Sequence, residues 1–465
     1  MHTDRIGRAA DNMEEILRQE IRDGGIPGAS FAVLHHGETV IRRHINYAPD
    51  AIFRVYSMSK PITAVAAHIL WERGKLDWNT PLFYYLPEYE HMNVLTDQGL
   101  VPAARPIVLM DLLRMTSGIV YPDTDPAGKE MDTLFSRIQK EIAQGKQTST
   151  QELCRLIAEQ PLAFHPGERW RYGLSCDVMG AVIEKVADRP LSEFYENEIF
   201  RPLGMEDTGF YVPKEKQERF TTLYEVSERM ETPSCEAQRQ DDLPISNRCA
   251  MGESVEAPPP FGQRQNDSPM QNRCAMGESV EAPPPFGRRQ NDSPMQNRFA
   301  MGESAAPLRY KEAAGRHLCL TECLTPPAFE SGGAGIVSTL DDYAKFADML
   351  AHYGSAASLR LADCAAHPDE LYVERCDGLG KAGCCRILGR KTVESFEHGQ
   401  LSEAQKKTIY FDQIRGFTYG NFMRVYDDRT EAACSGDVGE FGWDGWTGPY
   451  FMANPKEEFA FVLML

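Results

Sequence analysis

The sequence feature that most constrains the fold is an apolar-rich run, Ile62 to Leu70, preceded directly by Ser57-Met-Ser-Lys60-Pro61. The run has the spacing of a buried helix, and Pro61 can stand in its first turn, where backbone N–H groups have no intrahelical partner to lose. Ser57 and Lys60 are three residues apart, so on a helix their side chains share one face. The first turn also presents free N–H groups and the positive end of the helix dipole. A serine placed there beside a partly desolvated lysine can be activated as a nucleophile.

The charge of the chain narrows the classes of partner. Its 49 lysines and arginines face 68 aspartates and glutamates, which gives a formal net charge of −19. This charge disfavours nucleic acids and anionic membranes as partners. No uninterrupted apolar run is long enough to span a bilayer, and residues 1–25 have the pattern of an amphipathic helix rather than a signal peptide. We therefore expect a cytoplasmic protein that binds small molecules rather than nucleic acid or membrane.

Two groups of cysteines raise the alternative of a metal site: Cys319 with Cys323, and Cys376 with Cys384 and Cys385. None of them has the paired Cys-x-x-Cys spacing that is typical of structural zinc sites. In a cytoplasmic protein the 12 cysteines are expected to be reduced. The sequence thus predicts structural thiols, with no metal and no cofactor.

The order of the predicted elements suggests an α/β (α+β) fold interrupted by a helical domain. Strand-like runs occur near both ends of the chain, and those near the C-terminus alternate with tight glycine turns, as in an antiparallel sheet. We predict four parts: residues 1–74 as the N-terminal part of the α/β domain, 75–212 as a mainly helical domain, 213–328 as an insertion, and 329–465 as the C-terminal part of the α/β domain.

The predicted insertion contains a tandem repeat of 25 residues. Arg-Cys-Ala-Met-Gly-Glu-Ser begins at Arg248, recurs at Arg273, and returns at Arg298 with Phe299 in place of the cysteine. This period falls in the range of solenoid repeats, but the units are rich in Pro, Gly, Asn and Gln and carry few residues that could build a core. We predict a largely disordered insertion. A proline-rich ligand for a partner protein is the alternative.

Four motifs follow one another along the chain: Ser57-x-x-Lys60, Tyr172-Gly-Leu174, Gly332-Gly-x-Gly335 and Trp443-Asp-Gly445. With these motifs, and with flanking segments such as Leu112–Gly118 and Phe164–Tyr172, the chain resembles the serine β-lactamase-like hydrolases. That group contains class C β-lactamases, D-alanyl-D-alanine peptidases and family VIII carboxylesterases. The resemblance covers most of residues 10–213 and 329–465. It implies the β-lactamase/transpeptidase-like fold, an antiparallel sheet flanked by helices with an inserted all-α domain.

The resemblance also implies a mechanism. Ser57 would attack a carbonyl carbon and form an acyl-enzyme, which water would then hydrolyse. Lys60 and Tyr172 would transfer the proton of the Ser57 hydroxyl, with either of them as the general base. The oxyanion hole of the family maps onto the backbone N–H groups of Ser57 and Trp446.

Departures from the family pattern indicate the substrate. Penicillin-recognising members usually have Asn or Ser where this chain has Leu174, and a cation followed by a hydroxyl where it has Trp443 and Asp444. Replacing the cation with an indole and adding a carboxylate should disfavour anionic substrates. We therefore assign Leu174, Trp443, Asp444 and Gly445 as substrate-binding residues for neutral esters.

Three functions follow in order of expectation. The first is a serine hydrolase that acts as a carboxylesterase on small neutral esters. The second is a D-amino-acid amidase or peptidase, or a weak β-lactamase. The third is an inactive scaffold whose proline-rich insertion binds a partner.

Overall fold

The computed structural model describes residues 2–226, 310–312, 319–356 and 385–465. The repeats that begin at Arg248 lie outside these residues, so the prediction of a disordered insertion stays a prediction. Among the described residues, no helix is both long enough and apolar enough to cross a membrane.

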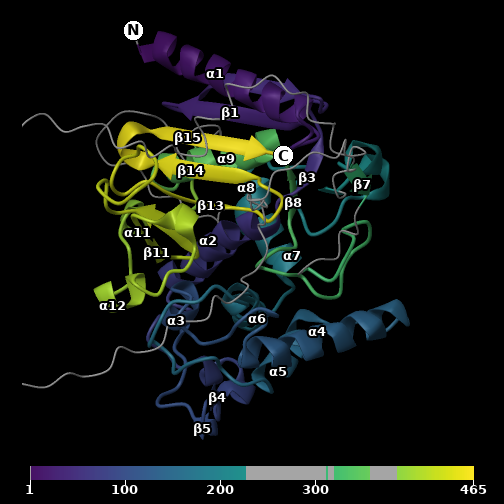
Figure 1. The fold of residues 1–465 in the computed structure, drawn as a ribbon, viewed down its shortest axis with the longest axis vertical. Coiled ribbons are helices and arrows are strands. Elements are labelled where there is room, and N and C mark those ends of the chain that lie inside the picture. Colours follow the sequence, from purple (N-terminus) through teal and green to yellow (C-terminus); the bar gives the residue numbers. More distant parts are fainter. Residues whose placement is uncertain (1, 227–309, 313–318, 357–384) are drawn as a thin grey trace, which may run out of the picture. The chain divides into compact units, whose positions relative to one another are not determined.

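The central element is a seven-stranded antiparallel sheet with the strand order β11-β12-β13-β14-β15-β1-β2, part of which is visible in Figure 1. The two N-terminal strands therefore join the C-terminal strands through the pairing of β1 with β15. The strands are β1 (Ala29–His35), β2 (Glu38–Ile45), β11 (Phe417–Gly420), β12 (Met423–Tyr426), β13 (Phe441–Asp444), β14 (Tyr450–Asn454) and β15 (Phe459–Met464). This arrangement, flanked by helices, confirms the predicted fold class.

Alternation along β1 separates two hydrophobic layers. Ala29 and Phe31 pack with α1 (His2–Arg22), whose apolar side supplies Ala10 and Leu17. Ala32 and Leu34 of β1 face the main core instead. This core also contains residues of α2 (Ser59–Glu72) and α9 (Leu340–Ala351). The predicted amphipathic N-terminal helix thus covers one face of the sheet, and the helix that follows Ser57 lies in the core on the other face.

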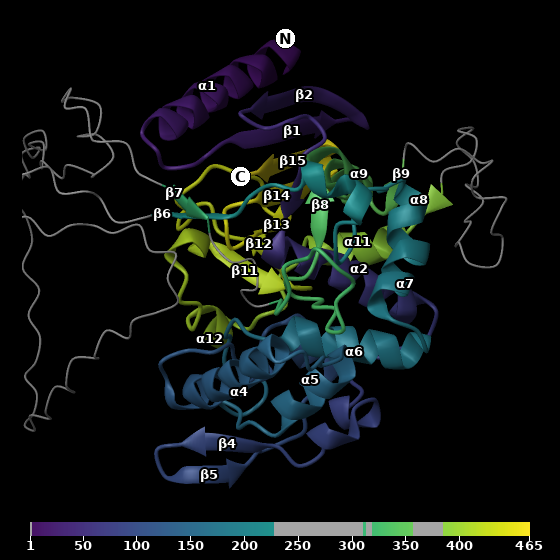
Figure 2. The ribbon, with the colours of Figure 1, turned by 90° about the vertical axis from the view of Figure 1, so that its right-hand side faces the viewer.

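The remaining helices are mostly grouped in the middle of the sequence. Figure 2 shows α4, α5 and α6 together with a hairpin, β4–β5, below the sheet and away from α1. The helices are α3 (Leu109–Leu113), α4 (Pro126–Ala143), α5 (Thr150–Ala158), α6 (Ser175–Ala187), α7 (Leu191–Tyr195), α8 (Arg201–Leu203), α11 (Arg390–Phe396) and α12 (Glu403–Lys406), with a π-helix at Glu196–Phe200. The hairpin β4 (Asn93–Thr96) and β5 (Gly99–Pro102) means that this region is not entirely helical.

Three more pairs of short strands join distant segments. The pair that matters for the site is β3 (Ile52–Arg54) with β8 (Val337–Thr339), because these strands lead directly into Ser57 and out of the Gly332–Gly335 motif. The other pairs are β6 (Tyr224–Val226) with β7 (Tyr310–Glu312), and β9 (Ser355–Ala356) with β10 (Cys385–Arg386).

Candidate active site

Ser57 lies in a single 3-10 turn, Tyr56–Met58, that stands between β3 and α2. The sequence predicted Ser57 in the first turn of the helix; the structure places it one short turn before Ser59, where α2 begins. The turn is fixed from two sides, since the Val55 N–H donates to Ile336 O (3.1 Å) and the Tyr343 hydroxyl donates to Met58 O (2.8 Å). Ser57 is 6% exposed and therefore almost completely buried.

The backbone just before Ser57 is strained. Tyr56 has a φ of +43°, a left-handed backbone conformation that residues other than glycine rarely adopt. Its side chain is fully buried. Strain of this kind persists only where surrounding packing over-determines it, and it is concentrated at functional sites. Here it belongs to the turn that presents Ser57.

Lys60 is completely buried and uses all three of its ammonium protons. Its Nζ donates to Ser57 Oγ (3.0 Å), to the Tyr121 hydroxyl (3.1 Å) and to Gly333 O (2.8 Å). Burial disfavours the ammonium, whereas negative charge on the acidic groups around it, among them Tyr121, Tyr172 and Asp177, acts the other way, and the pKa of Lys60 is raised overall. Lys60 therefore rests as an ammonium directed at the Ser57 hydroxyl.

Tyr172 completes this cluster. Its hydroxyl accepts a hydrogen bond from Trp443 Nε1 (3.0 Å), and its ring lies 4.7 Å from Lys60 Nζ. Burial raises the pKa of Tyr172, whereas the charge of Lys60 and hydrogen bonds with Lys60, Ser57 and Trp443 act in the opposite direction. The structure thus brings together Ser57, Lys60 and Tyr172, the three residues that the sequence assigned to catalysis.

Gly173 allows the segment that carries Tyr172 to lie close to the segment that carries Tyr121. A Cβ on Gly173 would lie only 2.1 Å from Ile119 O, so the segment that carries Tyr172 packs directly on the backbone that leads to Tyr121. The rings of the two tyrosines are 5.6 Å apart as a result. The sequence did not predict Tyr121 at the site, although it follows the recognised segment Leu112–Gly118 by three residues.

The predicted oxyanion-hole segments also meet. A Cβ on Gly445 would lie 2.5 Å from Val55 O, so the turn between β13 and β14 packs against the backbone that carries Ser57. The ring of Trp446 lies edge-on to that of Tyr56, with centroids 5.5 Å apart. The residues whose N–H groups are assigned to the oxyanion hole, Ser57 and Trp446, therefore stand on two adjoining turns.

Two predicted substrate-binding residues behave differently from the expectation. Leu174 is 1% exposed and belongs to the main core, so in this arrangement it has no surface for a substrate and acts only through packing. Asp444 stays partly exposed, but its carboxylate pairs with Arg424 (3.6 Å), whose guanidinium lies over the rings of Phe417 and Tyr450. Because Arg424 compensates its charge, Asp444 does not present an isolated anion, which weakens the argument that it repels anionic substrates.

The described part of the chain shows no cluster of side chains that supports the alternative of a metal site at the cysteines. Cys319 and Cys323 are both buried, and no group of three or more His, Cys, Asp or Glu side chains among the described residues could hold a metal ion. Cys376 and Cys384 lie outside the described residues.

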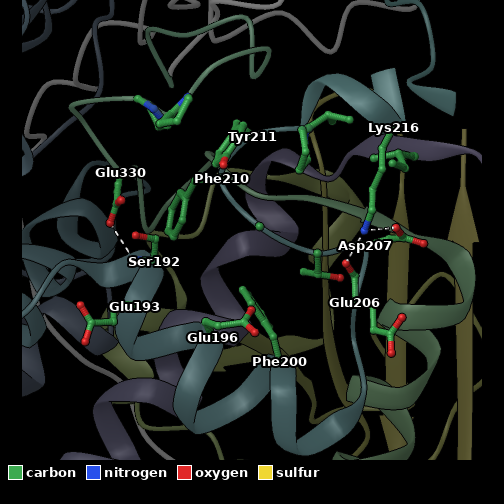
Figure 3. A pocket seen from close by; sticks show the side chains of 17 residues that line it. Ser192, Glu193, Glu196, Phe200, Glu206, Asp207, Phe210, Tyr211, Lys216 and Glu330 are labelled. Atoms are coloured by element: carbon green, nitrogen blue, oxygen red, sulfur yellow. Dashed lines mark hydrogen bonds and ion pairs between the residues drawn. The ribbon is translucent and has the colours of Figure 1, made fainter. Parts of the chain in front are cut away.

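A cavity of about 460 Å³ lies apart from this cluster. Figure 3 shows Phe210 and Tyr211 beside it, with Glu193 and Glu196 on one side and the Lys216–Asp207 ion pair on another. Ser57, Lys60 and Tyr172 are absent from its lining, so it does not belong to the candidate active site.

The antiparallel sheet, the buried lysine beside a serine, and the facing tyrosine define the class of the β-lactamase-like serine hydrolase fold. The chain belongs to the beta-lactamase family, whose family model matches residues 13–465.

Relatives agree with this membership and include esterases. Protein Rv1367c of Mycobacterium tuberculosis (strain H37Rv) is 25% identical over 469 residues, covering 96% of this chain and 88% of the relative. Esterase EstB of Burkholderia gladioli is 32% identical over 228 residues, covering 46% of this chain and 54% of the relative. Lovastatin esterase of Penicillium rubens is 34% identical over 171 residues, covering 35% and 40% of the two chains.

Solved structures show the same fold. EstCE1, a hydrolase with promiscuous acyltransferase activity, matches with a TM-score of 0.61 and 21% identity, covering 98% of this chain and 92% of its own. Unliganded simvastatin synthase LovD from Aspergillus terreus matches with a TM-score of 0.62 and 16% identity, with the same coverage.

Proposed function

We propose that this protein is a carboxylesterase that forms an acyl-enzyme at Ser57. The observation that carries the proposal is the contact of Lys60 Nζ with Ser57 Oγ (3.0 Å) in a cluster that also holds the Tyr172 hydroxyl. A buried nucleophile next to two groups able to exchange protons is the arrangement that covalent catalysis requires.

Ester hydrolysis would proceed by acylation and then deacylation of Ser57. In its reactive form the Lys60–Tyr172 pair has already lost one proton, either as Lys60 ammonium with Tyr172 phenolate or as two neutral groups. Ser57 Oγ attacks the ester carbonyl carbon while its proton passes to this pair, and the N–H groups of Ser57 and Trp446 stabilise the oxyanion. Collapse of the tetrahedral intermediate breaks the bond to the leaving alcohol, which takes the proton back from the pair. Water then attacks the acyl-enzyme in the same way and releases the carboxylic acid. Either Lys60 or Tyr172 can receive the serine proton, because the two titrate as a coupled pair.

The aromatic surroundings favour neutral, apolar acyl groups. Trp443 stands where penicillin-recognising relatives usually have a cation, and the Tyr172 ring also contacts Phe411, with centroids 5.7 Å apart. Tyr410 and Trp446 are about half exposed, at 51% and 43%, so aromatic surface is available to a substrate near the site. The esterases among the relatives support ester hydrolysis.

The test is hydrolysis of p-nitrophenyl acetate and butyrate, beside nitrocefin, by the wild type and by Ser57→Ala. We expect ester turnover that is lost in Ser57→Ala, with nitrocefin slow or unchanged. Preferred turnover of nitrocefin would favour the β-lactamase alternative with the same nucleophile. A folded protein that hydrolyses none of these and does not react with a fluorophosphonate would favour the scaffold alternative.

A further inference from the structure

The Gly332-Gly-Ala-Gly335 motif has no role in the steps above, yet it touches the centre of the site. Gly333 O accepts a hydrogen bond from Lys60 Nζ (2.8 Å), and Gly332 O accepts one from Thr63 Oγ1 on the same helix (2.7 Å). The loop that carries the motif is thus bound to α2 through two successive carbonyl groups.

On its other side the same loop is held by Asp177 of α6. Oδ1 of Asp177 accepts from Ser331 Oγ (2.6 Å) and from the Gly333 N–H (3.1 Å). A Cβ on Gly333 would lie 2.6 Å from Asp177 Oδ2, so the close approach of the carboxylate requires glycine at this position. One residue, Gly333, therefore links the Asp177 carboxylate to the Lys60 ammonium.

The charges around Lys60 give this carboxylate a second role. The titratable groups that act on Lys60 come from four segments and are Tyr121, Tyr172, Cys176, Asp177 and Asp444. Burial raises the pKa of both tyrosines and of the Cys176 thiol, which keeps all three neutral near pH 7. Asp444 is engaged with Arg424. Asp177 is 2% exposed, and its carboxylate accepts from hydroxyl and amide donors. Burial raises the pKa of Asp177, whereas the charge of Lys60 and the hydrogen bonds from Ser331 and Gly333 act in the opposite direction and favour the carboxylate.

A fully buried ammonium is costly unless a negative charge compensates it. We propose that Asp177 is a positioning residue of the reaction, which holds the Gly332–Gly335 loop beneath Lys60 and supplies the buried counter-charge of its ammonium. The inference rests on the proposed function, because it takes from there the role of Lys60 in proton transfer.

The first test separates charge from packing with Asp177→Asn. The amide oxygen can still accept from Ser331 and Gly333, but the charge is gone. We expect kcat for p-nitrophenyl butyrate to fall at least tenfold with KM changed less than about twofold. We also expect the acidic limb of the kcat/KM profile to move down by about one pH unit, since removing a negative charge favours neutral Lys60.

Two control variants sharpen this result. Ser331→Ala removes a loop contact but keeps the carboxylate, so its pH profile should match the wild type. Asp342→Asn removes a different buried carboxylate, on α9, and should likewise leave the profile in place. A wild-type pH profile in Asp177→Asn, with only reduced thermal stability, would overturn the proposal.

A second test does not depend on activity and requires only that the four proteins of the cycle fold well enough to be titrated with denaturant. In a double-mutant cycle on unfolding, Lys60→Met leaves the Asp177 charge uncompensated, and adding Asp177→Asn should restore part of the lost stability. Strictly additive effects would refute the counter-charge. Because this cycle is read from unfolding, it still decides the role of Asp177 if the protein hydrolyses no ester, which would defeat the proposed function alone.

Discussion

Trp443 Nε1 donates a hydrogen bond to the Tyr172 hydroxyl at 3.0 Å. A donor at this oxygen stabilises the phenolate more than the neutral phenol, so it lowers the pKa of Tyr172 against the stronger, opposite effect of burial. Under the proposed mechanism, the indole therefore favours the proton-accepting form of Tyr172 without adding a positive charge to the site.

Trp443→Phe should reveal this contribution, because it keeps an aromatic ring and removes the N–H, together with one of the two fused rings of the indole. We expect kcat/KM to fall by roughly 10- to 100-fold, the effect of losing a hydrogen bond to a charged group. The acidic limb of the pH profile should move to higher pH, since the pKa of Tyr172 rises. Trp71→Phe is the matched control, because Trp71 is a partly exposed indole on α2. An unshifted pH profile in Trp443→Phe would contradict the assignment.

Gly445→Ala tests the contact between the two oxyanion-hole turns. The added Cβ would lie 2.5 Å from Val55 O, so the turn must move away from Ser57. We expect ester turnover to fall by about two orders of magnitude, as for loss of one oxyanion donor, while unfolding loses about 1–3 kcal/mol. Gly7→Ala is the control, since nothing lies within 4 Å of the added carbon on α1, and it should leave activity unchanged. Full activity in Gly445→Ala would show that this approach is not needed.

Under the proposed assignment of Trp443 and Asp444 to substrate binding, the Arg424–Asp444 pair would set the charge that a substrate meets. Asp444→Asn removes the partner of Arg424 and leaves a cation near the end of β13. We expect the ratio of kcat/KM for p-nitrophenyl hemisuccinate over p-nitrophenyl butyrate to rise several-fold. Arg424→Leu should lower the same ratio. A ratio that is unchanged in both variants would mean that the pair does not face the substrate.

His68 makes stability depend on pH. Burial lowers its pKa from 6.5 to about 4, and its Nδ1 lies 2.8 Å from Ala64 O. Below pH 6.5 the unfolded chain binds a proton that the folded protein does not, so the free energy of unfolding should fall by up to about 3 kcal/mol between pH 6.5 and 4. His68→Phe should lose this part of the pH dependence in urea titrations. His91→Gln, which changes a histidine whose side chain is 90% exposed, should retain it.

The sequence predicted well what depends on local spacing. Ser57 and Lys60 are in contact because they are three positions apart across the 3-10 turn and the start of α2. The apolar run Ile62 to Leu70 likewise has a spacing that predicts the buried helix α2. Tyr172 and Trp443 could be assigned only through the family resemblance, since they lie far apart in the sequence and meet across the site.

Contacts that depend on tertiary packing were missed. Tyr121 and Asp177 reach Lys60 through segments brought together by Gly173 and Gly333, and no local pattern encodes those approaches. Leu174 was predicted to bind substrate from its position in a motif, whereas the structure buries it. The carboxylate of Asp444 was expected to disfavour anionic substrates, and nothing in the sequence links it to Arg424.

The three hydrogen bonds of Lys60 go to Ser57, Tyr121 and Gly333. The ammonium therefore has all its acceptors only when three segments that are distant in the sequence have packed together. A partly assembled chain would have to bury that ammonium with donors unmatched, at a cost of several kcal/mol. Assembly of the site and completion of the fold are therefore one cooperative event. Enzymatic activity and tertiary structure should disappear together as denaturant is added, and the loss of one reports the loss of the other.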